Sequence, residues 1–355
     1  MSSTGAGEPG TTATRGPGAP LADGTEIPLV DRPPTPACDR STVPVAKRPP
    51  ILLAKGHGTG NDFVLLRDPD GVLDLGPEAV RALCHRRTGF GADGVIRVVR
   101  SAALEDGAEQ AGLAEWFMDY RNADGSVAQM CGNGVRVFVH YLVSTGLVRL
   151  DDGAHLTVGT RAGVKTVHRD GALLAVDLGP WRIVGGPQAV VDGGDVQVRA
   201  AGTTRVSTGL SVDLGNPHVV VPLLDAEQLR ATDLREQPVL DPAPEQGSNV
   251  EFVVPPAQDG GDAEPELPMR VYERGVGETL SCGTGAAAAV LATRALRGGG
   301  PVRWWVRVPG GMLRVGCGPE LIAGAHVELA GPAELVGRGE LDPGWLAAHW
   351  PQADG

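Results

Sequence analysis

The sequence predicts an α/β protein of the α+β type, with two pseudo-symmetric lobes, each a mostly antiparallel sheet wrapped around a central helix. A Cys-Gly-X-Gly pattern occurs at residues 131–134 and again at 282–285. A long apolar stretch of helical character follows each copy, and a helix that is apolar all round is a buried one. Short alternating segments with glycine turns surround both copies and predict antiparallel strands.

The first lobe is expected to begin with a strand at residues 51–55 and a glycine-rich loop at 56–61. A helix at 77–87 has proline in its first turn and Cys84 on its apolar face, which favours a structural role for that thiol. Residues 102–114 predict a surface insertion. Further strands are expected at 116–120, 155–158, 164–168, 173–178, 196–199, 218–221, 250–254, 269–273, 304–308 and 312–315. Loops are expected at 241–246 and 255–268.

The chain divides around the two cysteine motifs. Residues 51–177 form the predicted N-terminal lobe with Cys131, completed by residues 332–345, and residues 178–331 form the C-terminal lobe with Cys282.

Residues 1–49 are rich in Gly, Pro, Thr, Ser and Ala and predict a disordered tail. A secretory signal would need a basic start and an apolar core, which the tail lacks.

Composition excludes several classes of protein. A net charge of −12 disfavours a nucleic-acid partner or an anionic membrane partner, both of which attract basic surfaces. No apolar run reaches the 18 residues of a transmembrane helix. The five cysteines are odd in number and lack the paired spacing of zinc sites or disulfide frameworks. We therefore expect a cytoplasmic protein with no metal.

Each Cys-Gly-X-Gly motif predicts a cysteine at the start of a helix. The unpaired N–H groups there carry partial positive charge and bind a carboxylate. The same field lowers a thiol pKa from roughly 8.5 to between about 3.5 and 7.5 in known cases. Two such helix starts could hold one carboxylate with a sulfur on either side of its α-carbon. A racemase or epimerase without a cofactor needs that geometry.

Asparagine is rare and always lies in a polar motif flanked by Gly, Asp or Cys. Its side-chain amide donates and accepts, which suits a substrate carrying ammonium and carboxylate groups, although asparagine also favours turns. The five are Asn61, Asn122, Asn133, Asn216 and Asn249.

The stretches 122–134 and 270–285, in this order and spacing, resemble those of diaminopimelate epimerases, and the resemblance covers about residues 51–341. It implies a fold of two related lobes and interconversion of LL- and meso-diaminopimelate, a lysine and peptidoglycan precursor, without metal or pyridoxal phosphate. It also implies that Cys282 accepts the α-proton in the LL-to-meso direction while Cys131 donates one. Because two thiolates would repel, the pair should titrate as a coupled unit.

The resemblance assigns the remaining site residues. His218 and Glu273 are implied to tune the thiol pKa values. The backbone N–H groups of Gly132, Asn133, Gly283 and Thr284 are implied to bind the reacting carboxylate. The far end of the substrate would be recognised by Asn61, Asn122, Asn216, Asn249, Glu273 and Arg274. Position 94 is glycine, whereas many members of the family have glutamine there. The resemblance therefore leaves one contact near the site unassigned.

Three alternatives remain at this point. A racemase of a one-headed amino acid would leave Glu273 and Arg274 without a second head group to bind. A pyridoxal-phosphate enzyme would need a Schiff-base lysine, and none of the three lysines lies in such a motif. A redox sensor would close Cys131 and Cys282 into a disulfide. The oligomeric state is open, a homodimer included.

Overall fold

The computed structural model describes residues 50–203, 205–257 and 263–350. The predicted disordered tail, residues 1–49, lies outside the described residues. The described chain is of the mixed α/β class, as predicted, and its sheets dominate over its helices.

The N-terminal lobe contains eight strands and two α-helices. Two short 3₁₀ helices lie where the surface insertion was predicted. In chain order the elements are β1 (Leu52–Gly58), β2 (Asn61–Arg67), α1 (Pro77–Cys84), β3 (Gly94–Arg100), η1 (Ser101–Ala103), η2 (Glu105–Gln110), β4 (Trp116–Asn122), α2 (Gly132–Ser144), β5 (His155–Gly159), β6 (Lys165–Asp170), β7 (Leu173–Pro180) and, from the end of the chain, β19 (Glu334–Glu340). A last helix, α6 (Pro343–His349), packs with α1 in a small separate core.

The C-terminal lobe repeats this plan. Its elements are β8 (Arg182–Ile183), α3 (Gly186–Val191), β9 (Val196–Arg199), β10 (Ser207–Asp213), β11 (Pro217–Pro222), α4 (Ala226–Ala231), β12 (Val239–Asp241), β13 (Asn249–Val253), β14 (Glu266–Glu273), β15 (Gly277–Thr279), α5 (Gly283–Leu296), β16 (Arg303–Val308), β17 (Gly311–Cys317) and β18 (His326–Gly331).

The two lobes share one order of strand pairing. In the first, β2 pairs parallel with β3, β3 antiparallel with β4, and β4 parallel with β5. In the second, β11 pairs parallel with β13, β13 antiparallel with β14, and β14 parallel with β16. The other named pairings are antiparallel, and β7 joins β18 across the lobes. This matching order is the structural form of the repeat seen in the sequence.

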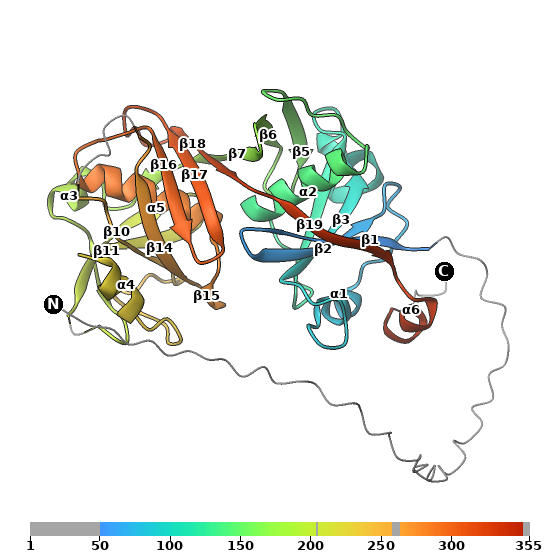
Figure 1. The fold of residues 1–355 in the computed structure, drawn as a ribbon, viewed down its shortest axis with the longest axis horizontal. Helices are drawn as coiled ribbons and strands as arrows, with labels where there is room; N and C mark the ends of the chain where they lie inside the picture. The colour runs from blue at the N-terminus through green and yellow to red at the C-terminus, as the bar shows by residue number, and fades with distance from the viewer. Residues whose placement is uncertain (1–49, 204, 258–262, 351–355) are drawn as a thin grey trace, which may run out of the picture. The chain divides into compact units, whose positions relative to one another are not determined.

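Each lobe surrounds one apolar helix (Figure 1). Helix α2 contacts β1, β2, β7 and β19, whereas α5 contacts β10, β11, β13 and β17. Six of the seven residues in the run Gly283–Ala289 of α5 are alanine or glycine, and small side chains let the strands approach the helix closely. Both helices belong to one continuous apolar core. They place their first turns, which carry the Cys-Gly-X-Gly motifs, at fixed positions on that core.

Several boundaries differ from the predictions. The predicted loop at residues 56–61 is wrong, because β1 continues to Gly58 and a two-residue turn at Thr59 and Gly60 leads into β2. The predicted loop at 255–268 is wrong at its end, because β14 begins at Glu266. Strand pairing extends both segments, and pairing partners far along the chain are not visible in a local pattern.

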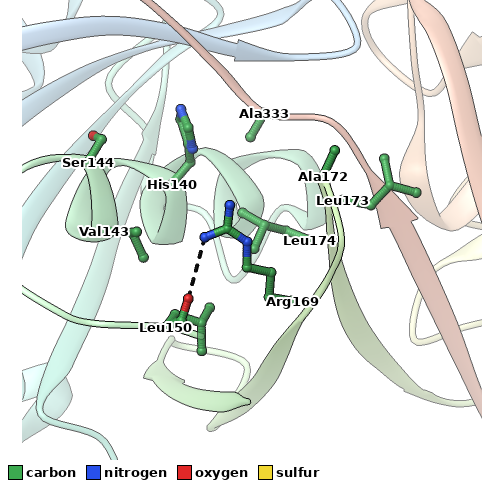
Figure 2. Close-up of a pocket in the computed structure, with 9 residues that line it drawn as sticks. All are labelled: His140, Val143, Ser144, Leu150, Arg169, Ala172, Leu173, Leu174 and Ala333. Carbon is green, nitrogen blue, oxygen red and sulfur yellow. Dashed lines mark hydrogen bonds between the residues drawn. The ribbon is translucent and has the colours of Figure 1, made fainter. Parts of the chain in front are cut away.

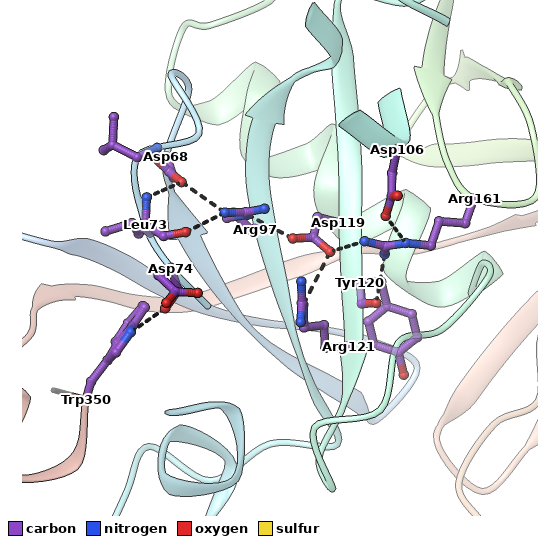
Figure 3. Close-up of polar contacts among 11 residues, drawn as sticks. Asp68, Leu73, Asp74, Arg97, Asp106, Asp119, Tyr120, Arg121, Arg161 and Trp350 are labelled. Carbon is purple, nitrogen blue, oxygen red and sulfur yellow. Dashed lines mark hydrogen bonds and ion pairs between the residues drawn. The ribbon is translucent and has the colours of Figure 1, made fainter. Parts of the chain in front are cut away.

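A buried ion-pair network holds β4 in the N-terminal lobe (Figure 3). Asp119 is fully buried and accepts from Arg97 Nε at 2.8 Å and from Arg161 Nη2 at 2.7 Å, with Arg121 Nε 3.5 Å away. Burial by itself would raise the pKa of Asp119, but these three guanidinium groups outweigh it and lower that pKa. Arg97 also reaches the carboxylate of Asp68. The network fixes the strand that precedes the Cys131 motif.

Loops of the two lobes also touch beside the helix starts. Thr59 Oγ1 donates to Ser281 Oγ at 2.7 Å. No helix among the described residues is both long enough and apolar enough to cross a membrane.

Candidate active site

Both motif cysteines lie where the sequence predicts them, each capping the N-terminus of its central helix. Cys131 is the N-cap of α2 and Cys282 is the N-cap of α5, both with extended backbone. The two helix starts meet at one side chain, Leu329. A Cβ atom placed on Gly132 would lie 3.6 Å from Leu329 Cδ2, and one on Gly283 would lie only 2.7 Å from it. A side chain at position 283 would therefore have to displace the end of the Leu329 side chain.

Asn133 links the two helix starts directly. Its Nδ2 lies 3.3 Å from the backbone oxygen of Ser281 in the other lobe and 3.4 Å from Asn61 Oδ1. Its Oδ1 accepts from Arg136 Nη2 at 2.7 Å. Because these contacts occupy the side chain of Asn133, its contribution to a ligand would come from its backbone N–H.

Cys131 is half-buried, and its Sγ donates to Asn61 Oδ1 at 3.5 Å. Asn61 is itself held by Asp93, whose Oδ2 accepts from Nδ2 at 2.8 Å. Burial raises the pKa of the Cys131 thiol and the charge of Glu273 raises it further, whereas the N–H of Gly134 is the strongest influence that lowers it.

Cys282 is buried, and its Sγ accepts from the N–H of Gly285 at 3.4 Å. Burial, then the charges of Glu273 and Glu251, raise the pKa of this thiol well above its ordinary value, against the opposing hydrogen bonds from Thr284 and Gly285. The prediction that the helix starts lower the two thiol pKa values is therefore wrong. The helix N–H groups act in the expected direction, but burial outweighs them.

A line of hydrogen-bonded side chains leads to Cys282. His218 Nδ1 lies 2.7 Å from Glu251 Oε1, and His218 Nε2 lies 3.1 Å from Asn216 Oδ1. Asn216 Nδ2 donates to Thr284 Oγ1 at 3.3 Å, and that hydroxyl is 3.6 Å from Cys282 Sγ.

Glu251 is a site residue that the sequence prediction missed. It occupies the centre of β13 and is fully buried among apolar neighbours. A lone acidic residue within the apolar run Asn249–Val253 was the available signal, because a buried carboxylate requires a specific partner.

Glu273 is the acidic group that influences both cysteines. Thr279 Oγ1 donates to its Oε1. Burial raises the pKa of Glu273, and the charge of Glu251 raises it further, although the Thr279 hydrogen bond opposes them.

Arg274 follows Glu273 on the surface. Its backbone N–H donates to Asn249 Oδ1 at 3.0 Å, and its guanidinium donates to the backbone oxygen of Gln246 at 2.7 Å. The predicted residues Asn249, Glu273 and Arg274 thus form one group where β13 begins and β14 ends.

Asn122 lies in its own turn, as asparagine often does. Its Nδ2 donates to Ser126 Oγ at 3.0 Å. Gly94 is paired with Asn122 across the strands. A Cβ on Gly94 would lie 2.5 Å from the backbone oxygen of Arg121 and 2.6 Å from Tyr120 Cε2. The ring of Tyr120 therefore occupies the space that a side chain at position 94 would need.

The other two described cysteines are placed as structural residues. All four described cysteines, the motif pair included, are free thiols. Burial raises the pKa of Cys84 to about 12, and Cys317 Sγ accepts from Arg294 Nη1 at 2.9 Å.

A separate cavity of about 310 Å³ lies on the far half of α2 (Figure 2). It is lined by His140, Val143, Ser144, Leu150, Arg169, Ala172, Leu173, Leu174 and Ala333. His140 is nine residues past Cys131, so about 13 Å along the helix axis separates them. The cavity is distinct from the site around the cysteines.

Comparison with known sequences agrees with this arrangement. The profile described as diaminopimelate epimerase matches residues 53–184 and 210–334. The chain belongs to the diaminopimelate epimerase family. The diaminopimelate epimerase of Streptomyces coelicolor is 46% identical over 307 residues, covering 83% of this chain and 97% of the relative. That of Thermobifida fusca is 48% identical over 296 residues, covering 81% and 97%. Membership makes this chain an isomerase, as the motifs predicted.

Solved structures show the same two-lobed fold. A phenazine biosynthesis protein of the PhzF family from Bacillus anthracis superposes with a TM-score of 0.57 at 14% identity, covering 82% of this chain and 99% of that one. A hydroxyproline epimerase from Agrobacterium vitis gives 0.54 at 16% identity, covering 86% and 96%. At these identities the likeness concerns the fold alone.

Proposed function

We propose that this enzyme interconverts LL- and meso-diaminopimelate by a two-base mechanism in which Cys131 and Cys282 serve opposite faces of one α-carbon. The observation that carries the proposal is that two cysteines cap two buried helices whose first turns meet at Leu329. The named family and the identity of the relatives support the reaction and its place in lysine and peptidoglycan precursor synthesis.

The first step is binding of the reacting carboxylate. The N–H groups of Gly132, Asn133, Gly283 and Thr284 begin the two helices and carry partial positive charge. As the α-proton leaves, negative charge moves onto the carboxylate oxygens. Preorganised donors aimed at those oxygens stabilise the developing charge.

Proton transfer follows on the two faces. In the LL-to-meso direction the Cys282 thiolate takes the α-proton, and the Cys131 thiol returns its own proton to the opposite face. One proton is removed and one is added, so the enzyme ends with its thiol and thiolate exchanged. The raised thiol pKa values make each thiolate a stronger base toward a weakly acidic α-carbon.

The far head group of the substrate is assigned to the group where β13 begins and β14 ends. Arg274 can clamp a carboxylate with two parallel hydrogen bonds, and Glu273 can bind an ammonium. Asn61, Asn122, Asn216 and Asn249 are the amide side chains proposed to complete recognition. Selection of a second head group by such partners rejects amino acids that lack it.

The reaction itself is tested by incubating the enzyme with LL-diaminopimelate in deuterium oxide. We expect meso product that carries deuterium at one α-carbon, with activity unchanged by chelators or carbonyl-reactive reagents. Absence of exchange would refute the proposal, as would a chelator-sensitive activity that zinc restores.

The substrate assignment is tested at Arg274. We expect Arg274→Gln to weaken transition-state binding of diaminopimelate by roughly 2–5 kcal/mol, partly because a carboxylate is left unpaired. The control is Arg235→Gln, an exposed arginine paired with Asp233. If the wild type instead prefers lysine as a substrate, the enzyme is a racemase of one-headed amino acids.

We place the enzyme in the cytoplasm, where thiols stay reduced. The substrate is a small molecule, and we expect neither nucleic acid nor membrane as a partner.

A further inference from the structure

Glu251 has no place in the mechanism above, yet it lies beside one of the two helix starts. Its side chain is fully buried, and a Cβ on Gly285, in the first turn of α5, would lie 2.6 Å from Glu251 Oε1. Its second oxygen, Oε2, is buried without a hydrogen-bond partner in the part of the chain that the structure describes. A half-satisfied buried carboxylate costs free energy, so its position calls for an explanation.

Counting donors and acceptors fixes the protons on its partner. Asn216 Oδ1 can only accept, so His218 Nε2, 3.1 Å away, must carry a hydrogen. The 2.7 Å contact between His218 Nδ1 and Glu251 Oε1 holds a second proton, carried by one atom or the other. The pair of Glu251 and His218 is therefore neutral as a whole, which suits its complete burial.

These protons determine which atom donates in each of the remaining hydrogen bonds between His218 and Cys282. Since Asn216 accepts from His218 through Oδ1, its Nδ2 is the atom that faces Thr284 Oγ1 and donates to it. The Thr284 hydroxyl accepts there, so its own hydrogen is available to Cys282 Sγ at 3.6 Å. A donor directed at the sulfur favours the thiolate.

We propose that Glu251 is a positioning residue for Cys282, which holds the proton of His218 so that the chain through Asn216 and Thr284 ends with a hydrogen bond donated to the sulfur. The consequence of this hydrogen-bonded series for catalysis rests on the proposed function, but the series of hydrogen bonds itself does not. The charge of Glu251 by itself raises the pKa of the Cys282 thiol, as described above, so the proposal requires that the proton shared with His218 offsets that charge. The sign of the net effect of Glu251 on the thiol pKa tests this requirement.

The test is a double-mutant cycle between the two ends of the chain. Glu251→Gln, Thr284→Val and the double variant are made in a Cys131→Ser background, and the pH dependence of iodoacetamide alkylation at Cys282 is followed on the isolated peptide by mass spectrometry. We expect each single change to raise the Cys282 pKa by roughly one unit, which is about a tenfold loss of thiolate. We expect the double variant to match Thr284→Val, because both changes interrupt one chain.

Two control variants accompany the cycle. Thr284→Ser keeps the hydroxyl and should restore the pKa. Glu278→Gln removes a carboxylate that pairs with Arg270 and takes no part in this series of hydrogen bonds, so it should leave the Cys282 pKa unchanged. A lowered Cys282 pKa in Glu251→Gln would overturn the proposal, and so would additive effects in the double variant.

A second measurement needs no variant at Glu251. The ¹⁵N resonances of His218 in the wild-type protein should show a protonated Nε2 at neutral pH, and an unprotonated Nε2 would overturn the proposal. Both measurements are made without substrate. A protein that keeps the coupling but fails to epimerise diaminopimelate would refute the proposed function alone, whereas an active epimerase without the coupling would refute this inference alone.

Discussion

The two helix starts share one backbone design but differ in the layer of side chains beneath them. Beneath Cys131, a Cβ on Gly134 would contact Ile96 Cδ1 at 3.4 Å and the ring of Phe63 at 3.6 Å. Strand β2 pairs Phe63 with Gly94 and Leu65 with Ile96. This layer is apolar.

The equivalent positions of the second lobe carry ionisable groups. Strand β11 pairs His218 with Asn249 and Val220 with Glu251, in the same parallel register. Thus His218 takes the place of Phe63 and Glu251 takes the place of Ile96. The two lobes share the order of strand pairing and the N-cap cysteines, but the side chains beneath the two thiols differ. For a reaction that needs one thiol and one thiolate at a time, such a difference is useful.

Removal of either sulfur should have the largest effect. We expect Cys131→Ser and Cys282→Ser each to lower epimerisation to less than a few per cent of wild type, because a hydroxyl is far less acidic than a thiol and makes a poor base. Turnover of purified, folded variants is the measurement. Cys84→Ser and Cys317→Ser are the matched controls, and retained turnover in either motif variant would contradict the two-base assignment.

The buried ion-pair network around Asp119 in the N-terminal lobe should contribute to the free energy of unfolding. Asp119→Asn should cost about 3–5 kcal/mol of unfolding free energy, because Arg97 and Arg161 would keep buried charges without their partner. Urea unfolding measures the loss. The exposed pair of Asp70 and Arg100 is the control, for which Asp70→Asn should cost less than about 1 kcal/mol.

The same network predicts a pH dependence. Since the folded pKa of Asp119 lies below its unfolded value of about 3.9, its contribution is complete above that pH and is lost as pH falls through the folded pKa. The stability of Asp119→Asn should therefore fall less between pH 5 and lower pH than that of the wild type. Parallel curves would show that Asp119 is not the titrating group.

Arg136 tests whether the thiols are tuned independently. This buried arginine stands five residues after Cys131, where α5 has Ala287, and its charge lowers the pKa of Cys131. Arg136→Met should raise the Cys131 pKa by roughly one unit and leave Cys282 unchanged. Alkylation rates of both cysteines against pH provide the comparison, with Arg136→Lys as the charge-preserving control. An equal shift at Cys282 would mean that the lobes share their electrostatics.

Replacement of Glu273 should change the pKa values of both Cys131 and Cys282, and we expect this change to be the smallest effect. Its charge raises the pKa of each thiol, so Glu273→Gln should lower both by less than about one unit. The measurement uses free enzyme, because the same change is expected to weaken substrate binding. A shift at only one cysteine would place Glu273 with Glu251 as a residue specific to one lobe.

The comparison also explains what the sequence could predict. Helix starts at 132 and 283 follow from a local pattern of cysteine and small residues, and the strand at 196–199 was placed to the residue. Pairings such as β7 with β18 depend on partners about 150 residues away, which a local pattern does not contain. Among the proposed site residues, Asn61, Asn133 and Cys131 are brought into hydrogen-bond contact, whereas the Asn122 side chain bonds within its turn.

Charge effects were the least predictable part. The field of a helix start is visible in the sequence, so a lowered thiol pKa was the natural expectation. Burial of Cys282, the largest cause of its raised pKa, arises only when the strands of the second lobe pack against α5. The sequence shows Glu251 as one acidic residue of an apolar strand. Its partner His218 is 33 residues away, so their contact cannot be read from the local pattern.

The return of the chain to its starting lobe has a consequence for synthesis. Strand β19 pairs with β1, so residues 334–340 complete a sheet that begins at residue 52. While the ribosome is still making the second lobe, the edge of β1 has no strand to pair with, and unpaired edges promote association between nascent chains. The first lobe therefore reaches its final form only after residue 340 has emerged, and both cysteines have then been translated.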